Sequence, residues 1–211
     1  MEGKFIVFEG ISGCGKGTQA RRTLQYLQEA DEYNHILITP EPTRSDYGMQ
    51  VRALMREHRA QGEDPHAHAR KYLDLFIKDR LAHQPLIEEN LRQGVQVLGV
   101  RYYHSTIVHQ QSATLSAEEI IDTHRKAGIR FPDLTIILDV PPEEVLERIA
   151  SRSTMGVFET KKRLELSRER YLQLLSLLPE QKIVVVSAVG SVDDVFSSYK
   201  AELNHLLSYT Q

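Results

Sequence analysis

The stretch FEGISGCGKGTQARR, residues 8–22, decides the fold that the rest of the sequence must fit. A glycine, four residues and then Gly15-Lys16 follow the spacing of a phosphate-binding loop, G-x-x-x-x-G-K-[ST]. The hydroxyl comes one position late, because Gly17 stands before Thr18. An apolar run precedes the loop and a helical pattern follows it, and this context separates a phosphate loop from an ordinary glycine-rich turn. We therefore expect the loop to bind a nucleoside triphosphate.

Each residue type in this loop has a chemical reason to be there. Glycines let successive backbone N–H groups point at phosphate oxygens, and the N-terminus of the following helix adds partial positive charge. Lys16 adds a full charge, and Thr18 offers a hydroxyl to a phosphate or to Mg²⁺, directly or through a water. The expected nucleotide-binding residues of the loop are Gly10, Ser12, Gly13, Cys14, Gly15, Lys16, Gly17 and Thr18.

Short apolar runs alternate with helical patterns along the whole chain. The runs predict buried strands at residues 5–8, 36–38, 95–98, 134–138 and 183–186. The longer patterns predict helices at residues 16–29, 67–92, 142–151 and 158–178. This alternation predicts a three-layer α/β fold, in which a five-stranded parallel sheet has helices on both faces. No repeat or linker divides the 211 residues, so we expect a single domain, 1–211.

The charge and the apolar content of the sequence argue against nucleic acid and membrane as partners. Lys plus Arg number 26 against 29 Asp plus Glu, and a formal net charge of −3 gives no sign of nucleic-acid binding. No apolar run approaches membrane-spanning length, and the N-terminus shows no cleavable secretion signal. The single cysteine, Cys14, fits a reducing compartment. We therefore expect a cytoplasmic protein that binds neither nucleic acid nor membrane.

Nine histidines raise the question of a metal site. His66 and His68 are two residues apart at the start of a predicted helix, so their rings should point apart. We identify no cysteine or acidic residue that would complete a site with them. We interpret this pair as a solvated helix start.

Further motifs follow the other strands. They are EPTRSDYG (41–48), LFIKDRLAH (75–83), GVRYYHSTIVHQ (99–110), PDLTIILDVPPEEVLERI (132–149) and FETKKRLELSRERYLQL (158–174). Together with the phosphate loop, and in this order, they resemble the thymidylate kinase family nearly end to end. The resemblance implies a P-loop kinase fold, with ATP and Mg²⁺ as cofactors and nucleotides as substrates. It implies transfer of the γ-phosphate to a deoxynucleoside monophosphate, dTMP giving dTDP in the leading interpretation.

The resemblance also assigns an acceptor-binding region to residues 40–110. Arg44 and Arg101 match arginines that bind the acceptor's phosphate in relatives. Phe76 and Arg80, four residues apart on one helix face, match a pair that stacks on the base and hydrogen-bonds its edge. The other matched acceptor residues are Glu41, Ser105, His109 and Gln110. Several of these could instead be surface arginines, helix polar residues or core side chains, and both interpretations stay open at this point.

A short lid is expected at residues 148–158, by the same resemblance. Arg152 would move over the transferred phosphate when the lid closes. Arg148 would contact adenine or the triphosphate. The family's helical pairing suggests a homodimer, by analogy alone.

Two carboxylates of the family are missing from this chain. Ser12 replaces the acidic residue that holds the acceptor's 3′-hydroxyl, and Val100 replaces the aspartate of D-R-Y. One such electrostatic contact is worth roughly 10²–10³ in rate. We hypothesise that Glu9 takes over part of the metal or base role, with Glu41 as a second candidate. The expected catalytic residues are then Lys16, Arg101, Arg152 and Glu9.

These losses leave two alternatives open. One keeps the fold but phosphorylates another nucleotide or a nucleoside, with Glu9 as the general base. The other is a nucleotide-binding protein that has lost catalysis. The retained cations and the aromatic side chain of an acceptor pocket argue against the second alternative.

Overall fold

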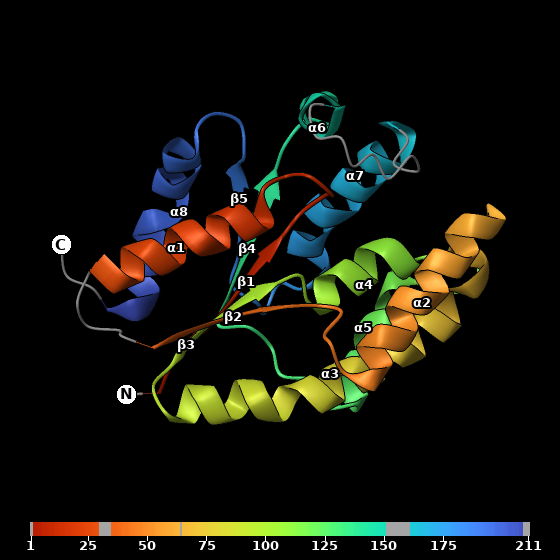
Figure 1. Cartoon of the computed structure of the whole chain (residues 1–211), viewed down its shortest axis with the longest axis horizontal. Coiled ribbons are helices and arrows are strands. Elements are labelled where there is room, and N and C mark those ends of the chain that lie inside the picture. Colours follow the sequence, from red (N-terminus) through yellow and green to blue (C-terminus); the bar gives the residue numbers. More distant parts are fainter. Residues whose placement is uncertain (1, 30–34, 64, 151–160, 209–211) are drawn as a thin grey trace.

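The computed structural model describes residues 2–29, 35–63, 65–150 and 161–208, and its centre is a parallel sheet (Figure 1). The five strands are β1 (Phe5–Glu9), β2 (Ile36–Pro40), β3 (Gln96–Val100), β4 (Leu134–Asp139) and β5 (Ile183–Ser187). They pair in the order β2-β3-β1-β4-β5, all parallel. The expectation of a five-stranded parallel sheet is confirmed.

Eight α-helices and one 3₁₀ helix are assigned in the described residues. They are α1 (Lys16–Glu29), α2 (Asp46–Gln61), η1 (Pro65–His68), α3 (Ala69–Arg92), α4 (Tyr103–Gln110), α5 (Ala117–Lys126), α6 (Pro142–Ala150), α7 (Lys161–Leu177) and α8 (Val192–Leu207). Helices α1 and α8 lie on one face of the sheet, and α3, α4 and α7 lie on the other (Figure 1). The three-layer α/β prediction is therefore confirmed. No described helix combines the length and the apolarity that a membrane crossing requires.

Burial follows the place of each strand in the sheet. All five residues of the central strand β1 are buried, because helices cover both of its faces. The outer strands β2 and β5 are mostly half-buried. Rings from the helices complete the core on both sides: Phe5 meets Tyr102 edge-on at 5.0 Å, and Phe8 meets Tyr199 at 5.9 Å between ring centroids.

The strand order places the site. From β1 the chain crosses to β2 on one side, whereas from β3 it crosses back over β1 to β4 on the other side. In open parallel sheets ligands bind outside the carboxyl ends of the strands where the direction of winding reverses. That point lies at the ends of β1 and β3, so the residues around Gly10 and Arg101 line the crevice.

Candidate active site

The phosphate loop curls around the side chain of Lys16. The Lys16 Nζ donates hydrogen bonds to the carbonyl oxygens of Gly10, at 2.9 Å, and Ile11, at 2.7 Å. Gly10 has a φ of 132°, and a Cβ there would lie 2.6 Å from the Leu138 carbonyl oxygen. Only glycine can therefore hold this close approach between the loop and β4. Helix α1 begins at Lys16, so its N-terminus faces the hollow of the loop.

Lys16 is a buried cation, 7 % exposed. Burial is the main cause that lowers the pKa of Lys16, and the positive charge of Arg101 lowers it further. A phosphate group entering the loop would bring negative charge next to this ammonium and raise its pKa again, because an opposite charge favours the charged form. The loop thus holds a positive charge that an anionic ligand would stabilise.

The other predicted loop residues surround this lysine. Cys14 is buried, with its Sγ 3.6 Å from the Lys16 Nζ. Ser12 is half-buried, and so is Thr18 in the first turn of α1. Thr18 and Lys16 therefore both lie in the first turn of α1, although the hydroxyl comes one residue later than in the usual phosphate-loop pattern.

Glu9 at the end of β1 is completely buried and anchors the start of α4. One carboxylate oxygen accepts from the backbone N–H groups of Tyr102, at 2.7 Å, and Ser105, at 3.2 Å. The other accepts from the hydroxyls of Ser105, at 2.7 Å, and Tyr171, at 3.0 Å. With four donors around it, Glu9 holds neighbouring groups in place. A base or metal role, as hypothesised from the sequence, would require Glu9 to give up one of these bonds.

Arg101 follows β3 in an unusual backbone conformation. Its φ is 68°, the left-handed region that non-glycine residues seldom adopt, and its N–H donates to the carbonyl of Phe8 at 3.0 Å. Its guanidinium donates to the hydroxyls of Ser105, at 3.0 Å, and Tyr171, at 3.3 Å. The same two hydroxyls bind Glu9, so this carboxylate acts on Arg101 through them. The structure thereby brings three of the expected site residues together: Lys16, Arg101 and Ser105.

His109 and Gln110 at the end of α4 border this group. Burial, and then the charges of Arg101 and Lys16, hold the pKa of His109 well below its usual range. Gln110 is buried, and its side-chain oxygen has no hydrogen-bond partner among the described residues. A neutral imidazole and an unpaired amide oxygen are groups that a nucleoside could contact.

Arg44 lies on a loop that α3 holds in place. On one side of it, Thr43 donates from its N–H and hydroxyl to the Asp79 carboxylate, at 2.8 Å and 2.5 Å. On the other side, the Ser45 hydroxyl donates to the same carboxylate at 2.6 Å. The side chain of Arg44 itself is exposed. An arginine on such a fixed loop can reach an anion in solution without reordering the backbone.

Arg80, which the resemblance assigns to the edge of the base, is enclosed in the protein and only 1 % exposed. Its Nε lies 2.7 Å from the Glu41 carboxylate, and a terminal nitrogen lies 2.9 Å from the His124 Nε2. The His124 Nδ1 lies 2.7 Å from the Ile120 carbonyl, so Nδ1 donates there and Nε2 accepts from Arg80. Burial, followed by the charge of Arg80, lowers the pKa of His124 to about 3. Glu41 therefore serves as the counter-ion of Arg80.

Phe76 lies on the same face of α3 as Arg80, which agrees with their spacing of four residues. It is half-buried on α3, and the Arg80 guanidinium carbon lies 5.4 Å from its ring centroid. The ring of Tyr102 lies on the same cation at 5.5 Å. Phe76 thus offers the partly open aromatic face, while Arg80 supports it from within.

An ion pair beside the phosphate loop was missed from the sequence. Arg168 on α7 makes two contacts with the Asp139 carboxylate, at 2.5 Å and 2.8 Å, and this bonding raises the pKa of Arg168. A small hollow between this pair and the loop is lined by Gly10, Ile11, Ile137, Leu138, Asp139, Val140, Arg168 and Tyr171. The motifs at 132–149 and 158–174 contain both residues, but only the fold brings them together.

The lid prediction can be followed only over residues 148–150, which form the end of α6. Arg148 donates to the Glu144 carboxylate, at 3.1 Å, and to the carbonyl of Ala188 after β5, at 2.9 Å. Arg152 and residues 151–158 of the predicted lid lie outside the described residues.

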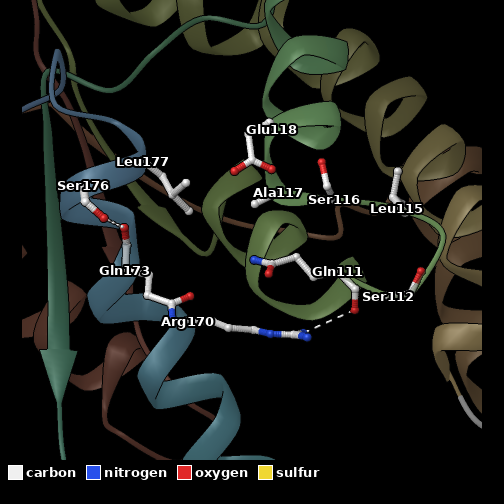
Figure 2. A pocket seen from close by; sticks show the side chains of 10 residues that line it. All are labelled: Gln111, Ser112, Leu115, Ser116, Ala117, Glu118, Arg170, Gln173, Ser176 and Leu177. Carbon is white, nitrogen blue, oxygen red and sulfur yellow. Dashed lines mark hydrogen bonds between the residues drawn. The ribbon is translucent and has the colours of Figure 1, made fainter.

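A separate hollow lies between the α4–α5 connection and α7 (Figure 2). At its edge Arg170 donates to the carbonyls of Val108, at 2.8 Å, and Gln111, at 3.4 Å. No phosphate-loop residue lines this hollow. We therefore place the nucleotide at the strand ends rather than here.

Comparison with known proteins gives a consistent result. The thymidylate kinase family model matches residues 8–198. A probable thymidylate kinase of Thermococcus onnurineus is 36% identical over 208 residues, which cover 96% of this chain and 98% of the relative. One of Pyrococcus horikoshii is 35% identical over 211 residues, 98% of both chains. A thymidylate kinase of Nitratidesulfovibrio vulgaris is 33% identical over an alignment of 216 positions, gaps included, which covers 97% of both chains.

Proposed function

The chain belongs to the thymidylate kinase family, and on that premise we propose that it transfers the γ-phosphate of MgATP to dTMP, giving dTDP and ADP. One observation carries the proposal. The lysine of a glycine-rich phosphate loop and the arginine after β3 are brought together at the point where the sheet reverses its winding. Phosphoryl transfer joins two anions, so it needs cations at their meeting point.

On the donor side, the loop N–H groups and Lys16 bind the β- and γ-phosphates. The donor set fits MgATP, because Mg²⁺ commonly uses phosphate oxygens and one or two protein oxygens, and Thr18 offers a hydroxyl at the helix end. When bound, Mg²⁺ supplies further neutralisation of the triphosphate. Arg148, held against Ala188 after β5, borders the adenine or triphosphate.

On the acceptor side, Arg101 and Arg44 bind the phosphate of dTMP. The thymine stacks on Phe76, with Arg80 behind that ring, and Gln110 offers its unpaired amide oxygen to the base. His109 stays neutral beside the two phosphate-binding cations, so it contacts the sugar by packing or hydrogen bonding without adding charge.

The catalytic group then consists of Lys16, Arg101 and, from the lid at 148–158, Arg152. Glu9 is a positioning residue, because it fixes the hydroxyls of Ser105 and Tyr171 that orient Arg101. A monophosphate acceptor is already ionised, so no general base is needed to remove a proton from it.

We also propose that the protein is a single domain, that it acts in the cytoplasm and that it does not bind nucleic acid. We further propose that it forms a homodimer. The charge of −3 supports the absence of nucleic-acid binding. Exposed apolar side chains on α2 and α3 support self-association: Met49, Met55, Leu81 and Leu86. Light scattering after gel filtration tests the dimer, and a mass equal to one chain at micromolar concentration contradicts it.

The reaction is tested by measuring ADP formation from MgATP with a panel of nucleosides and nucleoside monophosphates. We expect the highest kcat/KM with dTMP. Turnover confined to another acceptor overturns the assignment of dTMP. Binding of ATP without turnover on any acceptor overturns the enzyme itself.

A further inference from the structure

Three potential metal ligands converge where α2 ends and α3 begins. They are His58, Glu63 and His68, and each offers one ligand atom within 4.8 Å of the other two. His58 lies 3.7 Å from the Glu63 oxygen, and His68 lies 2.8 Å from it. In the part of the chain that the structure describes, no other three such groups meet in this way. The sequence interpretation, which found no acidic partner for His68, was wrong.

The backbone holds Glu63 over the last turn of α2. Gly62 adopts the left-handed conformation, with a φ of 68°, and its N–H donates to the carbonyl of Arg59 at 3.2 Å. The next N–H, of Glu63, donates to the carbonyl of His58 at 3.0 Å. These two bonds form a Schellman motif, which turns the chain back on its own helix. The meeting of His58 with Glu63 therefore follows from a defined helix end.

The two imidazole rings are stacked on each other. The rings of His58 and His68 stack with centroids 4.0 Å apart and planes inclined by 26°. The His58 Nδ1 lies 3.0 Å from the Tyr72 hydroxyl on α3. A hydrogen bond from Nδ1–H to that hydroxyl leaves Nε2 deprotonated and aimed at the carboxylate, as in many histidine ligands of metals.

From these contacts we propose that His58, Glu63 and His68 bind Zn²⁺ or a similar divalent transition-metal ion. Two imidazole nitrogens and one carboxylate oxygen are a typical zinc ligand set, completed by a water. Magnesium and calcium instead prefer sites made of oxygen ligands.

The distances suit a small ion after a local adjustment. Ligand atoms around a tetrahedral Zn²⁺ lie about 3.3 Å apart when each is about 2.0 Å from the metal. The separation of 3.7 Å between His58 and Glu63 is close to this value. The 2.8 Å contact of His68 is a hydrogen bond that must lengthen slightly when the metal replaces its proton.

Burial leaves one side of the site open. The His58 side chain is 8 % exposed, whereas those of His68 and Glu63 are 36 % and 41 % exposed. An ion can enter from the solvent side, and a water can occupy its fourth position. The bound ion would join the end of α2 to His68, the residue directly before α3, the helix that carries Phe76. Metal binding at this site does not depend on the kinase reaction.

The test is a titration of the chelator-treated, tag-free protein with Zn²⁺, by calorimetry and without nucleotide. We expect one ion per chain, and Mg²⁺ should not displace it. Co²⁺ should give the visible absorption bands of a tetrahedral site. The variants are His68→Ala and Glu63→Gln, which leave the buried His58 in place. His205→Ala, at an exposed histidine of α8, is the matched control.

Loss of an outer-sphere contact weakens metal binding by roughly 10–100-fold. His68→Ala and Glu63→Gln each remove a direct ligand, so each should weaken Zn²⁺ binding by more than that. His205→Ala should bind like the unaltered protein, and circular dichroism should confirm that all variants are folded. Binding that survives both His68→Ala and Glu63→Gln overturns the proposal. The proposal is also overturned if the folded, unaltered protein binds Zn²⁺ no more tightly than these variants do.

Discussion

The phosphate loop and the buried group around Arg80 each enclose a cation, but they hold it in different ways. We call the second group the α3 wall; it consists of Phe76 and Arg80 on α3 with Glu41 and His124. Lys16 is bound by two carbonyl oxygens of the loop, and burial lowers its pKa. Arg80 is paired at 2.7 Å with the buried carboxylate of Glu41. A cation that carbonyls hold still attracts an anion, whereas one with its own carboxylate is largely neutralised. We therefore propose that Lys16 receives phosphate, whereas Arg80 stabilises the α3 wall.

The largest effect should come from breaking the pair on the α3 wall. Glu41→Gln leaves Arg80 buried without its counter-ion, which should lower the free energy of unfolding by about 3–5 kcal/mol. MgATP binding by the folded protein should change little. Urea denaturation measures the first quantity and calorimetry the second.

Glu89→Gln is the matched control, because Glu89 pairs with Arg92 on the same helix at the surface. Exposed pairs of this kind contribute at most about 1 kcal/mol. If Glu41→Gln destabilises no more than Glu89→Gln, the buried pair does not support the wall.

A smaller effect, on activity, is expected from the buried carboxylate of Glu9. Glu9→Gln keeps the shape of the side chain but weakens its hold on the hydroxyls that orient Arg101. Misplacing a reacting group by about 1 Å can cost roughly 10²-fold in rate, so we expect kcat to fall by up to that factor. The Kd for MgATP should stay the same. An unchanged kcat would contradict the positioning role.

Acidification should gradually lower the free energy of unfolding through two buried histidines, His104 on α4 and His124 on α5. Burial lowers the pKa of His124 to about 3 and that of His104 to about 4, against about 6.5 in the unfolded chain. Below pH 6.5 the unfolded state therefore binds more protons, so the stability falls as the pH falls. Each histidine should remove up to about 1.4 kcal/mol per pH unit between pH 6 and its own pKa in the folded state.

Urea denaturation at several pH values measures this slope, and His124→Gln should reduce it. His205→Asn, at a surface histidine, should leave it unchanged. A slope that is the same in His124→Gln and in the unaltered chain would show that His124 is not kept neutral by the fold.

Much of the fold could be predicted from local patterns. The apolar runs located all five strands, and the glycine-rich loop located the start of α1. Helices α2, α4, α5 and α8 were missed, although signals for some were present. Ser45 caps α2 and Gly62 ends it, and Ser191 with Asp194 forms a capping box at α8. Helices α4 and α5 are short, with 8 and 10 residues, and leave little room for an apolar period. Helix α8 has buried residues at a helical spacing, Val195, Tyr199, Leu203 and Leu207, so its sequence carried a signal that was overlooked.

The partners of the site residues could not be predicted, because no local pattern encodes them. Glu9 and Tyr171 are 162 residues apart in the sequence, and Arg80 and His124 are 44 apart. The motifs indicated which side chains matter. Only the packing of α3, α5 and α7 against the sheet showed that Arg80 is enclosed and that Glu9 is saturated with donors.

The most direct test of the difference between the two cations is Lys16→Met, which keeps the length of the side chain and removes its charge. We expect dTMP-dependent ADP formation to fall roughly 10²–10³-fold. The midpoint of urea denaturation should stay the same or rise, since no carboxylate loses its partner. Turnover within tenfold of the unaltered protein, or a loss of stability like that of Glu41→Gln, would contradict the role of Lys16 as the cation that receives phosphate.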